Sequence, residues 1–198
     1  MIITEINKQA TTSVEIHPLL KKRWSPRVFS DTPISDQHFQ QLLEALRWAA
    51  SSMNEQPWRI IYGHKGTTAY DKIFDCFGEF NQKWADNATT LLLAGYKKNF
   101  SSGKENFHAL HDLGLGMSNL TIQAQSLNIT VHQMAGIDWK KAHKVYGVPE
   151  NYHIATGIAL GYYGGNAADL PSDLEEQELS PRKRKSIEEI AQEGKFPQ

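Results

Sequence analysis

The spacing of hydrophobic positions predicts alternating helices and strands as far as residue 163. From Ser35 to about Ala50, apolar residues recur at helical spacing and give one apolar face. Short apolar runs predict buried strands. The expected strands are 58–64, 89–96, 128–134 and 152–163, and the other expected helices are 67–77, 104–127 and 138–146. This alternation is typical of a layered α/β arrangement.

Residues 104–127 form the longest predicted helix. The residues expected to face the core are Phe107, Leu110, Met117, Leu120, Ala124 and Leu127. Gly114 and Gly116 lie inside this helix, where each costs about 1 kcal/mol relative to alanine. We therefore expect a neighbour or a ligand to approach the helix closely at these glycines.

The length of 198 residues is enough for a sizeable core and predicts one domain spanning 1–198. Beyond Gly165 the sequence becomes polar, so that about 166–198 reads as a tail. The tail contains glutamates at 175–178, the basic run "RKRK" at 182–185 and a short amphipathic "SIEEIA".

The charges are balanced, with 21 Lys and Arg against 22 Asp and Glu and a net charge of −1. No overall basic field is available to hold nucleic acid or an anionic membrane, so any anion site must be local. The longest apolar stretches, 91–96 and 154–163, are far shorter than the roughly 20 residues that cross a bilayer.

No basic segment followed by a long apolar one opens the chain, so no secretory signal is expected and the predicted location is cytoplasmic. The single cysteine, Cys76, cannot form an internal disulfide, which fits a reducing compartment. We expect it to be a buried small hydrophobic residue.

The segment "RWSPRVF" at 23–29 alternates Arg23, Ser25 and Arg27, which would share one face of an extended chain. Two guanidinium groups and a hydroxyl on one face suit a phosphate, because arginine bonds phosphate oxygens through a planar fork. The alternative interpretation is a solvated basic loop.

Two further segments carry polar or small residues beside predicted strands. "SSMNEQPW" supplies Ser51, Ser52, Asn54 and Gln56, which could hydrogen-bond the heteroatoms of a flat ring. In the alternative interpretation these side chains only bond their own backbone at the end of a helix. "HQMAGID" at 132–138 could bring backbone N–H groups close to a ligand, although a plain turn explains it equally well.

The histidines do not predict a metal site. His108 and His111 are spaced i, i+3 with Asp112 next to them, but no spacing supplies the further ligands of a closed site. The sequence also contains no G-x-S-x-G, no P-loop and no G-x-G-x-x-G after a strand, which argues against hydrolase, NTPase and Rossmann interpretations.

Taken together, several segments resemble the nitroreductase family of FMN-dependent oxidoreductases, from about His17 into the tail. They are "RWSPRVF", "SSMNEQPWRI", "HDLGLGMSNLTIQAQSLNI", "VHQMAGID", "IALGYY" and "RKRK". The resemblance implies an α+β, nitroreductase-like fold. Its central sheet would be mixed but mainly antiparallel and flanked by helices, with an extended C-terminal tail in a homodimer.

The resemblance also implies how the chain would hold FMN. Residues 23–27 and the basic pair of the tail would meet the phosphate and ribityl end, residues 51–56 would reach the flavin from the other subunit, and residues 133–136 would pass near flavin N5. The implied cofactor-binding residues are Arg23, Trp24, Ser25, Arg27, Ser51, Ser52, Asn54, Gln56, Gln133, Met134, Ala135, Gly136, Arg182 and Arg184.

The implied chemistry belongs to the cofactor, so no catalytic side chain is predicted. NAD(P)H would pass a hydride to flavin N5, and an oxidised acceptor such as a nitroaromatic or a quinone would then replace it. A cation such as Arg27 would stabilise the negative charge that reduced flavin gathers near N1 and O2.

The sequence departs from the family pattern at two positions. Ala50 stands where proline often precedes the two serines, and Ala135 stands where many members carry an acidic residue. Two alternatives stay open at this point. One is a flavin-binding family member that acts on another small molecule, and the other is a non-enzymatic interaction domain whose basic tail binds an anionic partner.

Overall fold

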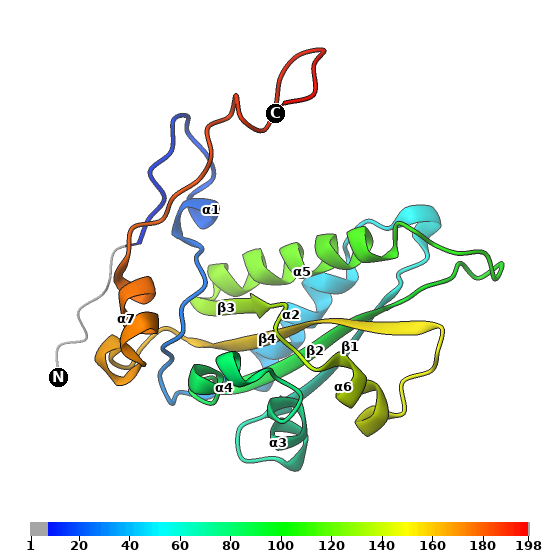
Figure 1. Ribbon diagram of the computed structural model, residues 1–198, viewed down its shortest axis with the longest axis horizontal. Coiled ribbons are helices and arrows are strands. Elements are labelled where there is room, and N and C mark those ends of the chain that lie inside the picture. Colours follow the sequence, from blue (N-terminus) through cyan, green and yellow to red (C-terminus); the bar gives the residue numbers. More distant parts are fainter. Residues whose placement is uncertain (1–7, 198) are drawn as a thin grey trace.

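A four-stranded sheet forms the centre of the computed structural model, which describes residues 8–197 (Figure 1). The strands are β1 (Trp58–His64), β2 (Thr90–Lys97), β3 (Ile129–Met134) and β4 (Tyr152–Tyr162), in the spatial order β1-β2-β4-β3. All three neighbouring pairs run antiparallel. The predicted α+β class is confirmed, whereas the expected mixed component is missing from the described residues, whose sheet is entirely antiparallel.

Helices cover both faces of the sheet (Figure 1). The helices α2 (Asp36–Arg47) and α5 (Ala109–Ser126) pack on one face, and α3 (Thr68–Phe74), α4 (Glu79–Ala85) and α6 (Trp139–Tyr146) lie on the other. Side chains alternate between the two faces along a strand. Leu92 of β2 therefore packs in the apolar cluster under α2 and α5, while Leu91 and Leu93 pack in the cluster on the opposite face. Coverage of both faces explains why β2 is an almost continuous apolar run.

The remaining elements are short and lie near the two ends of the chain or in connections. They are α1 (Pro18–Lys22), the 3₁₀ turns Ser52–Asn54 and Ala167–Asp169, and α7 (Ser172–Leu179). The segments before α1 and after α7 run side by side away from the sheet (Figure 1), joined by a 2.9 Å bond from Arg182 Nη1 to the Lys8 carbonyl. Among the helices described, none is long and apolar enough to cross a membrane.

The helix predicted from Ser35 is confirmed at its start and ends slightly earlier than expected. The Ser35 hydroxyl accepts a 3.2 Å hydrogen bond from the backbone N–H of His38, which caps α2. Phe39, Leu42 and Leu46 are buried, as their spacing predicted. The helix ends at Arg47, so Ala49 and Ala50 belong to the connection that leads to the 51–57 loop.

The long helix α5 begins five residues later than predicted, at Ala109. Residues 104–108 instead form a turn, in which the Asn106 side chain accepts from the His108 N–H. Phe107 and Leu110 were expected in the core but are 79% and 55% exposed. The prediction failed here because helical spacing was extended into a turn whose backbone pairs with residues 98–100 instead, so that Phe107 is left exposed.

The two glycines of α5 have different surroundings. A Cβ at Gly116 would lie 3.3 Å from Leu46 Cγ and 3.6 Å from Trp58 Cε3, so the expected close approach is made by α2 and β1. At Gly114 a Cβ would meet nothing within 4 Å in the described chain. Gly114 therefore lies on the outward face of α5.

Two segments differ from their predictions. The expected helix 67–77 ends at Phe74, and a separate helix, α4, follows after Gly78. The amphipathic segment at 186–191 forms only a turn, with Ile187 and Ile190 exposed. Because this segment packs against no core, its apolar spacing did not determine a helix.

Candidate functional site

Four arginines that are far apart in the sequence line one cavity of about 190 Å³. They come from the strand-like segment after α1 and from the tail after α7, so the structure brings together the two basic segments singled out in the sequence. The lining residues are Lys8, Arg23, Trp24, Ser25, Arg27, Gln177, Glu178, Arg182 and Arg184. We call this the arginine cavity.

Arg23 lies among other cations in this cavity. Its Nη1 donates a 3.3 Å hydrogen bond to the Ser25 hydroxyl. Burial lowers the pKa of Arg23 most, and the charges of Arg182 and Arg184 lower it further. The positive charges of these three arginines therefore repel one another, and an anion bound between them would offset the repulsion.

Glu178 is the buried anion of the arginine cavity, and the sequence pattern did not reveal its role. The Arg27 backbone N–H donates to both carboxylate oxygens at 3.1 Å, and Arg27 Nη1 lies 3.8 Å from Oε2. Burial raises the pKa of Glu178, although these contacts and the Arg27 charge oppose the rise. The sequence placed Glu178 in a polar tail, but Glu178 is fully buried.

The Arg27 guanidinium bonds to α7 through one nitrogen and has a second nitrogen without a hydrogen-bond partner among the described residues. Its Nη2 donates to Gln177 Oε1 at 3.0 Å. Its Nε is buried and has no hydrogen-bond partner in the described part of the chain. A buried donor without a partner costs free energy, which is typical of a site that is completed by a bound group.

The two tail arginines behave differently. Arg182 Nη1 donates to the carbonyls of Lys8 at 2.9 Å and Lys21 at 2.8 Å, so it ties the tail to the segment around α1. Arg184 Nη1 donates only to the carbonyl of its neighbour Lys183. Arg182 therefore has a structural bond to the body of the protein, and the Arg184 guanidinium keeps most of its donors for another group.

His132 connects the arginine cavity to the end of β3, and no signal in the sequence indicated this. Its Nδ1 lies 2.9 Å from the Pro26 carbonyl oxygen, and its ring packs 4.4 Å from the Trp84 ring. Burial lowers the pKa of His132 to about 4, and the charges of Arg27 and Arg23 act in the same direction. The neutral ring therefore donates its Nδ1–H to Pro26 and fixes the position of segment 23–27.

The turn after β3 is partly occupied by internal contacts. Gln133 Nε2 donates to the Thr121 hydroxyl, and the Met134 side chain is buried in the core. Ala135 and Gly136 are exposed. A Cβ at Gly136 would lie 2.6 Å from Asn81 Nδ2, which donates to the Gly136 carbonyl, so this glycine is required by the approach of Asn81. Of the four predicted residues, Gln133, Ala135 and Gly136 are exposed, and Ala135 and Gly136 lie beyond the end of β3.

The 51–57 loop has an unusual backbone. Met53, Asn54 and Gln56 all have positive φ, at 52°, 56° and 49°, which non-glycine residues rarely adopt. The loop bonds itself, since the Gln56 N–H donates to the Ser51 hydroxyl, as the alternative interpretation expected. It is also fixed from outside by a bond from the Ser52 N–H to buried Asp112. Such backbone strain concentrates at binding sites.

Within one chain this loop and the arginine cavity do not meet. The loop lies near the start of α5, and the arginine cavity lies towards the other end of that helix (Figure 1). Asn54 and Gln56 are exposed and line neither the arginine cavity nor the cavity of about 330 Å³ beside Ser51, Ser52 and Asp112. Among the described residues, the two segments therefore line no common cavity within one chain.

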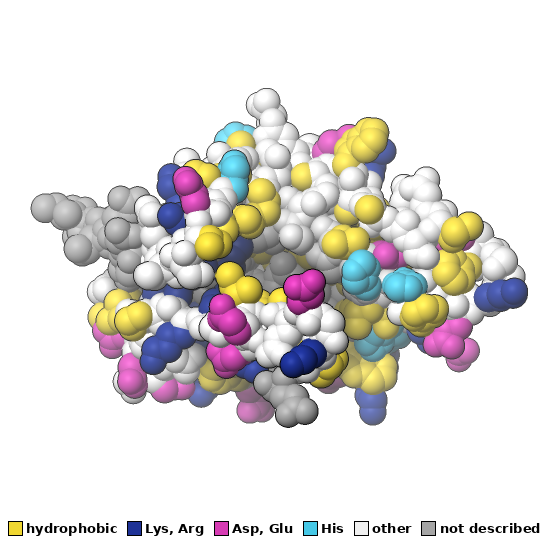
Figure 2. All heavy atoms as spheres, turned by 90° about the horizontal axis from the view of Figure 1, so that it is seen from above, with side chains coloured by type: hydrophobic (Ala, Val, Ile, Leu, Met, Phe, Trp, Pro, Cys, Tyr) yellow, Lys and Arg dark blue, Asp and Glu magenta, His cyan; other side chains and the backbone are white. Residues whose placement is uncertain are grey.

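Hydrophobic side chains next to this loop are exposed. Trp48 is 73% exposed and Met53 85% exposed, and Phe107, Leu110 and Leu115 also face outward. Figure 2 shows hydrophobic and histidine side chains together on this face of the molecule, above the first part of α5. Within residues 8–197, no three His, Cys, Asp or Glu side chains are grouped as metal ligands would be.

Comparison with known proteins identifies the family. The sequence matches the model of the nitroreductase family over residues 20–77 and 65–162. The chain belongs to the nitroreductase family. A crystal structure of an oxidoreductase containing FMN is 33% identical to it, with a TM-score of 0.88 over 94% of this chain and 95% of the other.

Two proteins with lower identity to this chain have names that state an activity. The major NAD(P)H-flavin oxidoreductase of Aliivibrio fischeri is 25% identical over 73% of this chain and 67% of its own. An FMN-dependent nitroreductase of Clostridium difficile R20291 is 21% identical, with a TM-score of 0.61 over 78% of this chain and 94% of the other. The second likeness shows a common fold.

Proposed function

We propose that the protein is an FMN-dependent oxidoreductase that moves a hydride from NAD(P)H to an oxidised small molecule, such as a nitroaromatic or a quinone. The arginine cavity carries this proposal, because four arginines line it and Glu178 is the one acidic residue among its described lining residues. Membership of the nitroreductase family and the FMN-containing relative support the identity of the cofactor.

The residues present fit a phosphate group. The arginine cavity of about 190 Å³ is lined by cations, contains the unpartnered Nε of Arg27, and is far smaller than a whole flavin. Arg23, Arg184 and the Ser25 hydroxyl would bind the phosphate through charge-assisted hydrogen bonds. The rest of the cofactor would then extend out of the cavity, towards the end of β3 to which His132 connects this segment.

The flavin ring supplies the hydride chemistry when the cofactor is bound, and the chain supplies binding and electrostatics. Ala135 and Gly136 would offer backbone N–H groups to the ring edge. Arg27, whose position is fixed by Glu178 and Gln177, would place positive charge near the reduced ring and so favour reduction. Neutral His132 would keep the segment that carries Ser25 and Arg27 in place.

We further propose that two copies of the chain build each site. The 51–57 loop of one copy would complete the arginine cavity of the other, with Ser51, Ser52, Asn54 and Gln56 at the ring. The separation of the two segments along α5 and the exposed hydrophobic side chains beside the loop support this assembly. A two-fold dimer would hold two equivalent sites.

The purified protein offers a direct test. The protein should carry bound yellow flavin, either as purified or after FMN has been added and the unbound FMN removed. Denaturation should release FMN, which chromatography distinguishes from FAD. A protein that retains no flavin after this treatment would exclude the proposal. Assays with NADH and NADPH against nitroaromatics and quinones would then separate nitroreduction from other flavin chemistry.

The alternative of a tail that binds an anionic partner has less support. Arg182 is bonded to carbonyls of the body rather than offered to a partner. A flavin enzyme acting on a different small molecule would share the same site, and only the acceptor assays would distinguish it.

A further inference from the structure

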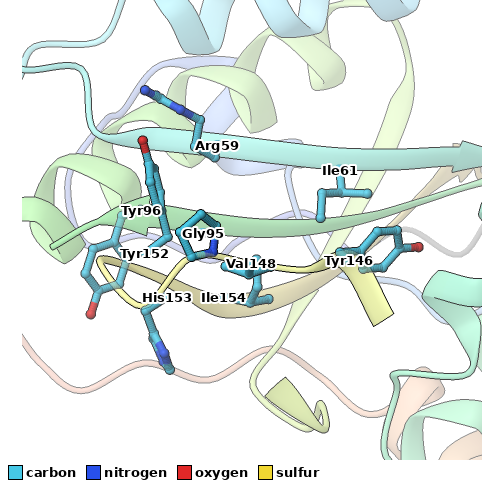
Figure 3. A pocket seen from close by; sticks show the side chains of 10 residues that line it. Arg59, Ile61, Gly95, Tyr96, Tyr146, Val148, Tyr152, His153 and Ile154 are labelled. Atoms are coloured by element: carbon cyan, nitrogen blue, oxygen red, sulfur yellow. The ribbon is translucent and has the colours of Figure 1, made fainter. Parts of the chain in front are cut away.

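A second cavity, of about 310 Å³, shares no lining residue with the arginine cavity or with the cavity beside Ser51 and Ser52 (Figure 3). It is formed by β1, the end of β2, the start of β4 and the connection from α6 to β4. Its volume falls within the range of small-molecule sites in proteins. We call it the tyrosine cavity, after the rings of Tyr96, Tyr146 and Tyr152 that line it.

The tyrosine cavity is apolar and suited to a flat molecule. Figure 3 shows Tyr96 and Tyr152 at one end and Tyr146 at the other, with Ile61, Val148 and Ile154 between them. Gly95 contributes no side chain to the floor, at the point where the β2–β4 register shifts between Ala94 and Gly95. A planar ring in this space could contact tyrosine rings and aliphatic side chains together.

One cation stands at the tyrosine cavity. Arg59 is exposed, and its guanidinium carbon lies 5.6 Å from the centroid of the Tyr152 ring. Its Nη1 donates to the carbonyls of Trp58 and Gln56, but no carboxylate pairs with it in the described part of the chain. A guanidinium has five N–H donors, so others remain for a ligand.

The other residues around this cavity add no negative charge. None of the described residues that line it is an aspartate or a glutamate. Burial lowers the pKa of His153, and the neighbouring His143 and Lys98 lower it further, so its ring is neutral at pH 7. The electrostatic surroundings therefore favour a ligand with a negative group near Arg59.

We propose that the tyrosine cavity binds a small planar aromatic carboxylate, with the ring between the tyrosines and the carboxylate at Arg59. The proposed ligand would occupy a cavity of its own, whose one described link to the proposed flavin loop is the bond from Arg59 Nη1 to the Gln56 carbonyl. The ligand class follows from an aromatic, apolar lining with a single unpaired cation beside it.

The test is calorimetric titration of 2-naphthoate into protein saturated with FMN, so that the flavin site is already filled. We expect one equivalent per chain with a dissociation constant below ~1 mM. The uncharged isostere 2-naphthamide should bind at least about fivefold more weakly, since it cannot form the charge-assisted bond.

Two substitutions assign the site. Arg59→Gln should weaken 2-naphthoate binding by about five- to tenfold through loss of the charge, with little effect on 2-naphthamide. Val148→Trp should abolish binding of both by filling the space. Lys144→Ala removes an exposed charge from α6, outside the cavity, and should leave the affinity unchanged.

Several results would overturn the proposal. They are no binding up to roughly 5 mM 2-naphthoate, binding that FMN displaces, equal affinity for the amide, or equal affinity in Arg59→Gln. If Val148→Trp does not fold, Arg59→Gln still decides, because Arg59 lies outside the core. If the protein does not bind FMN at all, the same titration without FMN tests this site while the proposed function fails separately.

Discussion

The backbone N–H of Ser52 donates a 3.0 Å hydrogen bond to Oδ2 of Asp112, whose carboxylate is buried in the first turn of α5. The bond fixes a loop in which three non-glycine residues have positive φ. Each such residue costs on the order of 1–3 kcal/mol and persists only when its surroundings hold it. Asp112 is therefore an anchor of the loop that we propose meets the flavin ring.

Replacing this anchor should weaken FMN binding. Asp112→Ala removes the acceptor, and the loss of a hydrogen bond to a charged group costs about 1.5–3 kcal/mol, or ten- to a hundredfold in affinity if the loop moves. Asp112→Asn keeps an acceptor oxygen and should restore most of the affinity. The measurement is titration of FMN into the apoprotein, followed by flavin fluorescence.

A matched control separates loop positioning from a general loss of a carboxylate. Glu150→Ala removes an exposed carboxylate from the α6–β4 connection and should leave FMN affinity unchanged. Equal FMN affinities for Asp112→Ala and the wild type would show that the anchor does not matter for the cofactor. Circular dichroism would confirm that both variants are folded.

Arg23→Ala should lower FMN affinity more than it changes turnover in FMN-saturated enzyme. The side chain lies in the arginine cavity with Ser25, where we propose that the phosphate binds. Loss of one charge-assisted bond to phosphate should cost on the order of 1.5–3 kcal/mol, about ten- to a hundredfold in affinity. Titration and saturated turnover are both measured, with Lys144→Ala as the charge-loss control. An unchanged dissociation constant would remove Arg23 from the site.

His132 should make stability fall as the pH is lowered. Its pKa is about 4 in the folded protein and 6.5 in the reference state, so below pH 6.5 the unfolded chain takes up a proton that the folded protein resists. Stability is therefore lost as the pH falls from about 6.5 towards 4. Between pH 7.5 and 5 this contribution should be about 2 kcal/mol.

The check is urea unfolding at several pH values. Between pH 7.5 and 5 the free energy of unfolding of His132→Gln should fall by roughly 2 kcal/mol less than that of the wild type, because a glutamine side chain does not titrate. Parallel curves for the wild type and His132→Gln would contradict the assigned neutral state.

A mixed dimer tests whether each site is shared by two chains. We expect Arg23→Ala and Asn54→Ala homodimers each to bind FMN poorly. In a heterodimer of the two, a shared site places both substitutions in one site and leaves the other site intact. One FMN per heterodimer should therefore bind with wild-type affinity, measured after exchange and isolation through different affinity tags.

The opposite outcome is equally clear. If each site lies within one chain, both sites of the heterodimer keep one substitution and neither recovers. FMN stoichiometry near zero in the isolated heterodimer would then rule out the shared site. The unmixed homodimers, carried through the same exchange, control for losses during handling.

Local pattern determined most elements of the fold. Strand β1 was predicted with its observed bounds, and Ser35 was recognised as the start of a helix. These predictions succeeded because periodic apolar residues and a capping hydroxyl act over a few neighbouring residues. The start of α5 was predicted wrongly, since whether Phe107 is buried depends on distant neighbours that local spacing does not report.

By itself, the sequence indicated which segments could bind a phosphate and, through their joint pattern, the family. Only the tertiary structure decided that Arg23 and Arg184 share one cavity, that Glu178 is buried against Arg27, and that Asp112 holds Ser52. The physical reason is that burial and pairing of charges depend on contacts between residues far apart in the chain. A glutamate in an acidic run has the same local sequence whether it is solvated or enclosed, and the desolvation that raises the pKa of Glu178 exists only once α7 has packed against segment 23–27.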